Sequence, residues 1–275
     1  MDANSDILDK HENDIEYQGF LLEVKYHLTQ YVNYSSNILS WFIENTEDNG
    51  VDHILVWLLR NSFEALDGIT VLLNDGCIRP TEPLFRILYE TIATVFFIGE
   101  KDSKQRALHY YVTYLLNQRK ILNKYPIEQK ETAQFKFVVN EINKELKSPM
   151  NQSIVEKYNG YPITRWFSKC EDGPKNITEL LDRMHHIFPK FPIFYSIYSG
   201  TVHGNSDWGQ QLTFQNIREL AKLRTANDLK MKVVITVLLY NFLIDFVLCG
   251  MPKKKIEFWD WFDKNIKTFY DDIKA

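Results

Sequence analysis

The chain has 275 residues, of which 45% are hydrophobic and 14% aromatic, so it is long and apolar enough to bury a large core. Its 32 basic and 36 acidic residues give a formal net charge of -4, which excludes a bulk attraction to nucleic acid but leaves room for a local basic patch. Three widely separated cysteines argue against a disulfide framework or a cysteine zinc site. With an N-terminus that resembles neither a signal nor a transit peptide, these features predict a cytoplasmic protein.

Apolar residues recur at helical spacing along the first half of the chain. Residues 1–15 are polar and are expected to form a flexible leader. The sequence does not decide whether the first predicted helix is continuous or interrupted near Tyr34. Helices are predicted over residues 16–47, 51–74, 80–99, 103–124 and 126–147.

The periodicity disappears between residues 148 and 176, where prolines and glycines predict a long irregular loop, with a short helix over 163–169 left open. No run alternates long enough to predict a sheet. The sequence therefore predicts an all-α bundle of about eight or nine helices, with residues 16–275 as one helical domain. The later helices are predicted over residues 180–188, 195–203, 233–251 and 255–273, the last being amphipathic and rich in aromatic residues.

The segment 233–251 is long and apolar enough to be weighed as a membrane span, and three lysines follow it. Asn241 and Asp245 lie in its middle, and an ionised Asp at the centre of a bilayer costs a few kcal/mol. We therefore favour a buried core helix and expect no membrane partner.

The helix over residues 80–99 is mostly apolar but carries Arg86 and Glu90 four residues apart on one face. Removing an unpaired ion from water costs several kcal/mol, so both charges must be satisfied within the fold. The best candidate for a partner is the downstream stretch 195–204, which contains several polar side chains.

In that stretch Tyr195, Ser199 and His203 are spaced by four residues, which puts them in a line along one helix face. His203 stands just before Gly204, at the expected C-terminus of the helix, where the helix dipole favours the imidazolium form.

An Arg beside a His suggests phosphate chemistry. Arg86 is expected to hold a phosphate while His203 transfers a proton, which suffices to cleave RNA through its own 2′-hydroxyl without a metal. We assign catalytic roles to Arg86, Glu90 and His203. Substrate-binding roles are assigned to Tyr195 and Ser199, and to Arg60 and Glu64 on the second predicted helix.

The alternative is that these groups only hold helices together, with Arg86 and Glu90 as an intrahelical pair and His203 with Ser199 as a hydrogen-bonded buttress. Because His185 and His186 lack a second pair of ligands at metal spacing, we expect no metal site. No phosphate-cradling glycine loop or dinucleotide fingerprint is present, and we expect no cofactor.

Two motifs resemble those of a bacterial helical family that carries only a domain-of-unknown-function label. The first is residues 76–98, GCIRPTEPLFRILYETIATVFFI, where R-x-x-x-E follows a turn glycine. The second is residues 195–204, YSIYSGTVHG, which matches Y-x-x-x-S-x-x-x-H-G. The resemblance covers roughly residues 16–250 and implies no assigned activity.

The chain is also loosely similar to the HEPN group of helical nucleotide-binding domains, many of which are metal-independent ribonucleases of toxin and phage-defence systems. Their signature places an Arg and a His on one helix, whereas Arg86 and His203 here come from two. The similarity implies a ribonuclease or nucleotide-acting effector of such a system, with RNA or a nucleotide as partner. The alternative is a non-catalytic interaction or scaffold module that binds a protein partner or forms a homo-oligomer, using the aromatic C-terminal helix.

Overall fold

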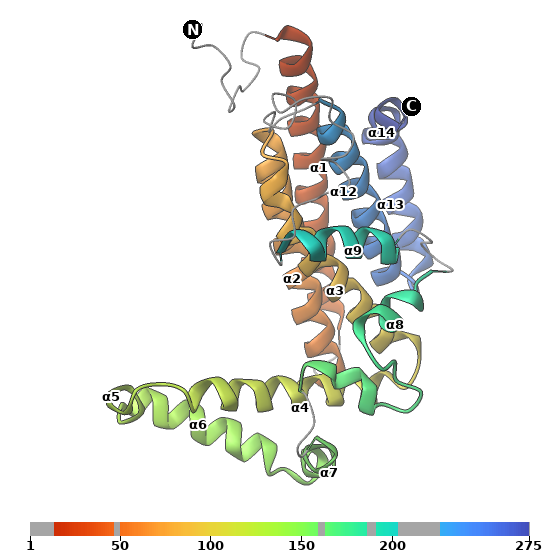
Figure 1. Ribbon diagram of the computed structural model, residues 1–275. Coiled ribbons are helices and arrows are strands. Elements are labelled where there is room, and N and C mark those ends of the chain that lie inside the picture. The colour runs from red at the N-terminus through yellow and green to blue at the C-terminus, as the bar shows by residue number, and fades with distance from the viewer. Residues whose placement is uncertain (1–13, 47–49, 159–162, 186–190, 203–225, 275) are drawn as a thin grey trace, which may run out of the picture. The chain divides into compact units, whose positions relative to one another are not determined.

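The computed structural model describes residues 14–46, 50–158, 163–185, 191–202 and 226–274. Within these ranges the regular elements are twelve α-helices and two short 3-10 helices, and no strand occurs (Figure 1). The predicted all-α fold is therefore confirmed.

The contacts of the chain divide it into two compact units, although residues 16–275 were predicted as one domain. Two helices, α2 (Gly50–Asn74) and α3 (Glu82–Glu100), contribute residues to both units. Unit 1 comprises residues 1–46, 58–92 and 190–275, and unit 2 comprises residues 47–57 and 93–189.

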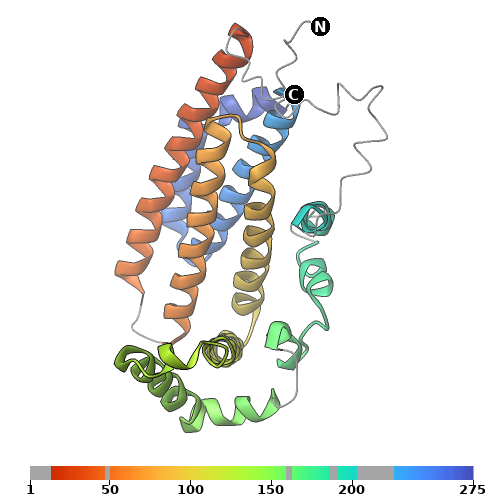
Figure 2. The same ribbon diagram turned by 60° about the vertical axis from the view of Figure 1, so that its left-hand side comes forward.

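Unit 1 is built on long helices that run lengthwise beside one another (Figures 1 and 2). The first, α1 (Ile15–Asn45), begins at Asp14, whose side chain accepts a hydrogen bond from the Tyr17 backbone N–H. It continues without interruption past Tyr34. The other helices of this unit are α9 (Phe191–Val202), α12 (Ala226–Val247), α13 (Pro252–Asn265) and α14 (Lys267–Lys274).

Helix α12 is the segment that resembled a membrane span, and its polar residues serve packing between helices. Asn241 accepts a hydrogen bond of 2.6 Å from the Tyr31 hydroxyl on α1. Asp245 accepts hydrogen bonds from Lys255 and Trp259 on α13. None of the described helices is long and apolar enough to span a bilayer.

The C-terminal segment was predicted as one helix over 255–273 but forms two, α13 and α14, with a break at Ile266. Ile266 is only 1% exposed, so the break lies against the core. The Trp261 ring stacks on Tyr34 of α1 with 4.1 Å between ring centroids, and Phe258 is fully buried. These aromatic side chains therefore pack inside unit 1.

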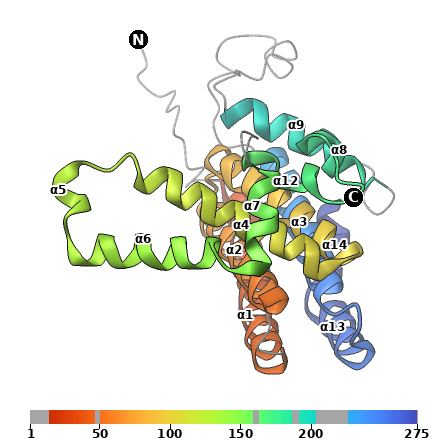
Figure 3. The same ribbon diagram turned by 90° about the horizontal axis from the view of Figure 1, so that it is seen from below.

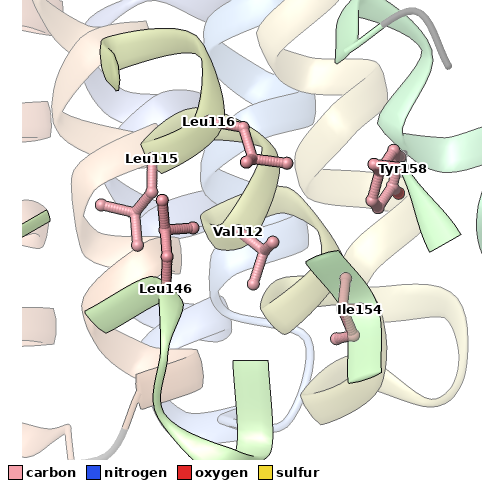
Figure 4. Close-up of a cluster of buried hydrophobic side chains, with 6 residues drawn as sticks. All are labelled: Val112, Leu115, Leu116, Leu146, Ile154 and Tyr158. Carbon is pink, nitrogen blue, oxygen red and sulfur yellow. The ribbon is translucent and has the colours of Figure 1, made fainter. Parts of the chain in front are cut away.

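Unit 2 contains a helical hairpin, in which α4 (Ser103–Leu122) and α6 (Ala133–Leu146) lie side by side (Figure 3). The predicted helix over 126–147 is thus interrupted, because the short α5 (Ile127–Lys130) ends before Thr132 caps α6. Figure 4 shows the small core of this unit. Its buried side chains are Val112, Leu115, Leu116, Leu146, Ile154 and Tyr158.

The segment 148–176, predicted to be irregular, contains α7 (Pro149–Lys157) and the 3-10 helix η2 (Ile163–Lys169), and α8 (Ile177–Asp182) follows it. The prediction was wrong for α7 because Pro149 is tolerated in the first turn of a helix.

Arg106 of α4, only 2% exposed, fastens the segment after η2 to the rest of unit 2. Its guanidinium donates hydrogen bonds to Glu100 at 3.0 Å and Asp172 at 3.1 Å and lies 3.8 Å from the centre of the Phe97 ring. Arg183 donates a second hydrogen bond to Glu100, at 3.3 Å. These non-local bonds hold in place a segment that shows no helical periodicity.

Candidate functional site

The first turns of α3 present three charged side chains on one face of unit 1. Glu82, Arg86 and Glu90 are spaced by four residues, so they lie one above another along the helix. A 3-10 turn, η1 (Arg79–Thr81), leads directly into the helix, with Pro80 at a position where a missing N–H costs little.

Arg86 and Glu90 form the predicted intrahelical pair, with 3.0 Å between Arg86 Nε and Glu90 Oε1. Burial lowers the pKa of the Arg86 guanidinium, but the hydrogen bond and charge of Glu90 outweigh this effect, so the pKa is raised. The Arg86 side chain remains 22% exposed and the Glu90 side chain 41%. The pair therefore lies at the edge of the core, in contact with solvent.

Tyr195 of α9 is the hydrogen-bond partner of Glu90, as the sequence predicted for the stretch 195–204. Its hydroxyl donates a hydrogen bond of 3.0 Å to Glu90 Oε1, the oxygen that also accepts from Arg86. The guanidinium carbon of Arg86 lies 6.0 Å from the centre of the Tyr195 ring. The predicted meeting of Arg86 and Glu90 with the Tyr195 stretch is thus confirmed.

The Tyr195 hydroxyl is held in its protonated form. Burial raises the pKa of Tyr195, and the charge of Glu90 raises it further. The charge of Arg86 and a hydrogen bond with Ser199 lower the pKa of Tyr195 but do not reverse the shift. Ser199 therefore belongs to the same group of side chains, one turn along α9.

His203, the third predicted catalytic residue, lies outside the described residues. It directly follows Val202, the last residue of α9, and is four residues beyond Ser199 in the sequence. Its proposed role is therefore still a prediction from sequence spacing.

Arg60 and Glu64 form a separate pair on α2, with 2.9 Å between Arg60 Nε and Glu64 Oε1. Their side chains are 66% and 59% exposed. Among the described residues, no hydrogen bond or ion pair joins this pair to Arg86 or Glu90. The structure thus does not bring Arg60 and Glu64 into the group around Tyr195.

A second ion pair, which the sequence analysis missed, lies deeper on the same face of α3. Lys232 of α12 donates to Glu82 Oε1 at 3.2 Å, and the two side chains are only 5% and 9% exposed. The Lys232 ammonium lies 4.2 Å from the centre of the Tyr198 ring. Glu82 precedes Arg86 by one turn, and this spacing could have indicated it; nothing local marks Lys232.

Burial dominates the electrostatics of this inner pair. It lowers the pKa of Lys232, and the charge and hydrogen bond of Glu82 offset only part of the effect. The second oxygen of Glu82, Oε2, is buried and has no hydrogen-bond partner among the described residues. The Lys232 and Glu82 pair is therefore shielded from water, whereas the Arg86 and Glu90 pair is accessible to solvent.

A metal centre has no support in the part of the chain that the structure describes. No group of three or more His, Cys, Asp or Glu side chains there is arranged to hold a metal ion. Cys77, Cys170 and Cys249 form no disulfide with one another, and His186 lies outside the described residues.

The fold and this site together define an all-α protein with a partly exposed Arg, Glu and Tyr group on two helices of one compact unit. The chain belongs to DUF5677, a family of unknown function, whose model matches residues 52–223. The family label in the sequence analysis is thereby confirmed. No match was found among curated proteins or among solved structures.

Proposed function

We propose that the protein acts on RNA or a nucleotide without a metal, through the group formed by Arg86, Glu90 and Tyr195 together with His203. The observation that carries the proposal is that Arg86 is oriented by Glu90 and yet 22% exposed. A guanidinium binds a phosphate in a planar, bidentate manner, and we place that contact at the exposed part of the Arg86 side chain.

The proposed reaction on RNA is attack by the 2′-hydroxyl on the neighbouring phosphate. His203 removes the proton of the 2′-hydroxyl, the 2′-oxygen bonds to phosphorus, and the bond to the 5′-oxygen breaks. The 5′-oxygen takes up a proton from water and the His203 imidazolium returns its proton to the resulting hydroxide, which leaves a 5′-hydroxyl and a 2′,3′-cyclic phosphate. Arg86 stabilises the negative charge on the phosphoryl oxygens, and Tyr195 and Ser199 orient the site.

The proposed setting is a bacterial toxin or phage-defence system in the cytoplasm, as the loose similarity to HEPN domains implies. This part of the proposal is an analogy at the level of the fold, because the chain lacks the Arg and His on one helix that mark that group.

The test is cleavage of a fluorescent single-stranded RNA by the purified chain in excess EDTA. Replacement of His203 by Gln is expected to lower the rate about 100-fold or more, because a positioned acid or base contributes that much. Arg86→Lys is expected to lower it about tenfold, because lysine cannot form the bidentate contact. The products are identified by mass, and a 2′-deoxy substrate should remain intact.

His185→Gln is the matched control, because His185 is exposed and lies in unit 2. It should leave cleavage unchanged. If His203→Gln and Arg86→Lys fold like the parent and cleave RNA and nucleotides at the parent rate, the catalytic proposal is wrong.

A non-catalytic interaction or scaffold module is the second candidate. Its support is that Glu90 already accepts hydrogen bonds from both Arg86 and Tyr195, which fastens α9 to α3 without a ligand. The aromatic residues of α13 no longer favour it, because Phe258 and Trp261 pack against unit 1 itself.

Under this second function Tyr195→Phe should lower the free energy of unfolding by about 1 kcal/mol, the usual worth of a hydrogen bond. No RNA cleavage should be found for the parent chain. Light scattering should instead show a homo-oligomer or a complex with a protein partner.

A further inference from the structure

One face of unit 2 combines exposed aromatic and basic side chains. Residues 103–127, which include all of α4, contain five Lys or Arg residues and no Asp or Glu. The chain as a whole has a formal net charge of -4, so this basic run differs from the rest of the sequence. A local excess of positive charge of this kind attracts phosphate groups.

The aromatic part of this face is formed by Tyr114 of α4 and Trp57 of α2. Their ring centroids lie 4.9 Å apart, with 64° between the ring planes. Trp57 also contacts Tyr110, and Tyr110 packs against the buried Trp166 with 5.1 Å between ring centroids. These contacts hold the outer rings in place, whereas Tyr114 remains 38% exposed and Trp57 is half-buried.

The basic part of the face follows Tyr114 along the chain. Lys120 lies in the last turn of α4, and Lys124 lies in the turn that follows; both are exposed. Among the described residues, no acidic side chain is paired with either lysine. At a rise of 1.5 Å per residue, Lys120 lies about 9 Å along the helix from Tyr114, so one short flexible strand can contact both.

We propose that the face formed by Trp57, Tyr114, Lys120 and Lys124 binds single-stranded nucleic acid. An unpaired base stacks on the Tyr114 ring, and the two lysines bind the neighbouring phosphates. Aromatic rings beside a basic surface bind single strands in this way, because every base has an aromatic face and every linkage carries a negative charge.

Two properties of the face select this partner. The unpaired lysines complement the charge of phosphate groups, and the exposed ring favours a single strand, because the bases of a duplex are already stacked on one another. The inference deepens the proposed function and rests on it only for the identity of the strand as the RNA substrate. Its tests measure binding without cleavage, so either proposal can fail without the other.

The first test is the binding of a short fluorescein-labelled strand of 2′-O-methyl RNA to the full chain, measured by fluorescence anisotropy. Methylation blocks the 2′-oxygen, so the proposed cleavage cannot occur. The single strand should bind about tenfold more tightly than its duplex with the complementary strand, because one stacked base contributes that much. Equal or tighter binding of the duplex overturns the proposal, as does the lack of saturable binding up to about 100 µM protein, the range of non-specific affinity.

The second test replaces the ring of Tyr114. Tyr114→Ala should weaken binding of the single strand about five- to hundredfold, the value of one base stacked on an aromatic side chain. Tyr114→Phe is the matched variant and should bind like the parent, because phenylalanine keeps the ring. Binding by Tyr114→Ala at the parent affinity would overturn the proposed stacking.

The phosphate contacts are tested through the salt dependence of binding. Lys120→Gln should lower the slope of log affinity against log salt concentration by about 0.7, the value of one phosphate contact on a single strand. Lys136→Gln is the matched control and should leave the slope unchanged, because Lys136 of α6 already pairs with Glu131 at 2.6 Å. A slope that is unchanged in Lys120→Gln would overturn the phosphate contact assigned to this residue.

A further readout uses the parent chain alone, so that it holds even if Tyr114→Ala fails to fold. A strand with one 5-iodouracil base is irradiated in the complex, which links the base covalently to an aromatic ring in contact with it. Mass spectrometry should locate the cross-link at Tyr114 or Trp57. Cross-links only at other residues would place the strand elsewhere and overturn the proposal.

Discussion

His109 stands in a buried hydrogen-bond chain of unit 2. Its Nδ1 lies 2.9 Å from the Tyr158 hydroxyl, which donates its own proton to the Trp166 carbonyl oxygen. Since Tyr158 has only one proton to give, His109 Nδ1 carries the hydrogen of the first bond. Burial, and to a smaller extent the charge of Lys157, lowers the pKa of His109 to about 4.

This shift predicts a loss of stability in mild acid. Because the folded pKa lies below the unfolded value, the unfolded chain binds a proton first as the pH falls from neutrality. Acidification from pH 7.5 to pH 5 should therefore cost about 2 kcal/mol of unfolding free energy through His109 alone. Urea denaturation of the parent and of His109→Gln measures the difference, since other groups contribute equally to both. An unchanged pH dependence in His109→Gln would contradict the assigned pKa.

At the scale of elements, two glycines in different settings should respond to alanine in opposite directions. A Cβ at Gly173, in the turn after η2, would lie 1.8 Å from the Phe167 carbonyl oxygen. That atom belongs to the backbone and cannot move aside as a flexible side chain could. Gly19, on the exposed face of α1, has nothing within 4 Å of such a Cβ.

We expect Gly173→Ala to lower the free energy of unfolding by about 1–3 kcal/mol, as overpacking does. Gly19→Ala should raise it by about 0.5–1 kcal/mol, because alanine is the better helix former. Urea titrations of both variants provide the measurement. A Gly173→Ala variant as stable as the parent would show that the turn relaxes freely.

At the scale of the whole molecule, each unit contains fully buried apolar side chains. Leu116 belongs to the cluster formed by α4, α6, α7 and Tyr158 in unit 2, whereas Leu28 of α1 is fully buried in unit 1. Truncating a buried side chain in one unit therefore removes packing contacts within that unit.

Leu116→Ala should cost about 2–5 kcal/mol, the usual loss for a truncated core leucine. Hydrogen exchange should show the loss of protection mainly in the helices of unit 2. Leu28→Ala, the matched variant, should lower protection mainly in unit 1. Equal loss of protection in both units from either variant would show that they open together.

The sequence predicted what depends on neighbours along the chain. The four-residue spacing of Arg86 and Glu90 predicted that they form a pair. The cost of burying an unpaired charge predicted that the helix containing Tyr195 contacts them.

Local pattern failed where a turn interrupts a helical pattern, as at Thr132 and Ile266, and where a helix lacks strong periodicity, as in α7. At Thr132 the cause is local, because its side chain caps α6, and α7 begins at Pro149, which the first turn of a helix tolerates. At Ile266, which is 1% exposed, packing against the core outweighs propensity.

The sequence by itself determined the all-α class, the long helices and the charged face of α3, because helical periodicity and buried charge are properties of short stretches. Only the tertiary structure decided the partners of Lys232 and Arg106, since Glu82 and Asp172 lie far away along the chain. The same holds for the contact between Trp57 and Tyr114, because the two rings come from different helices that no local pattern relates.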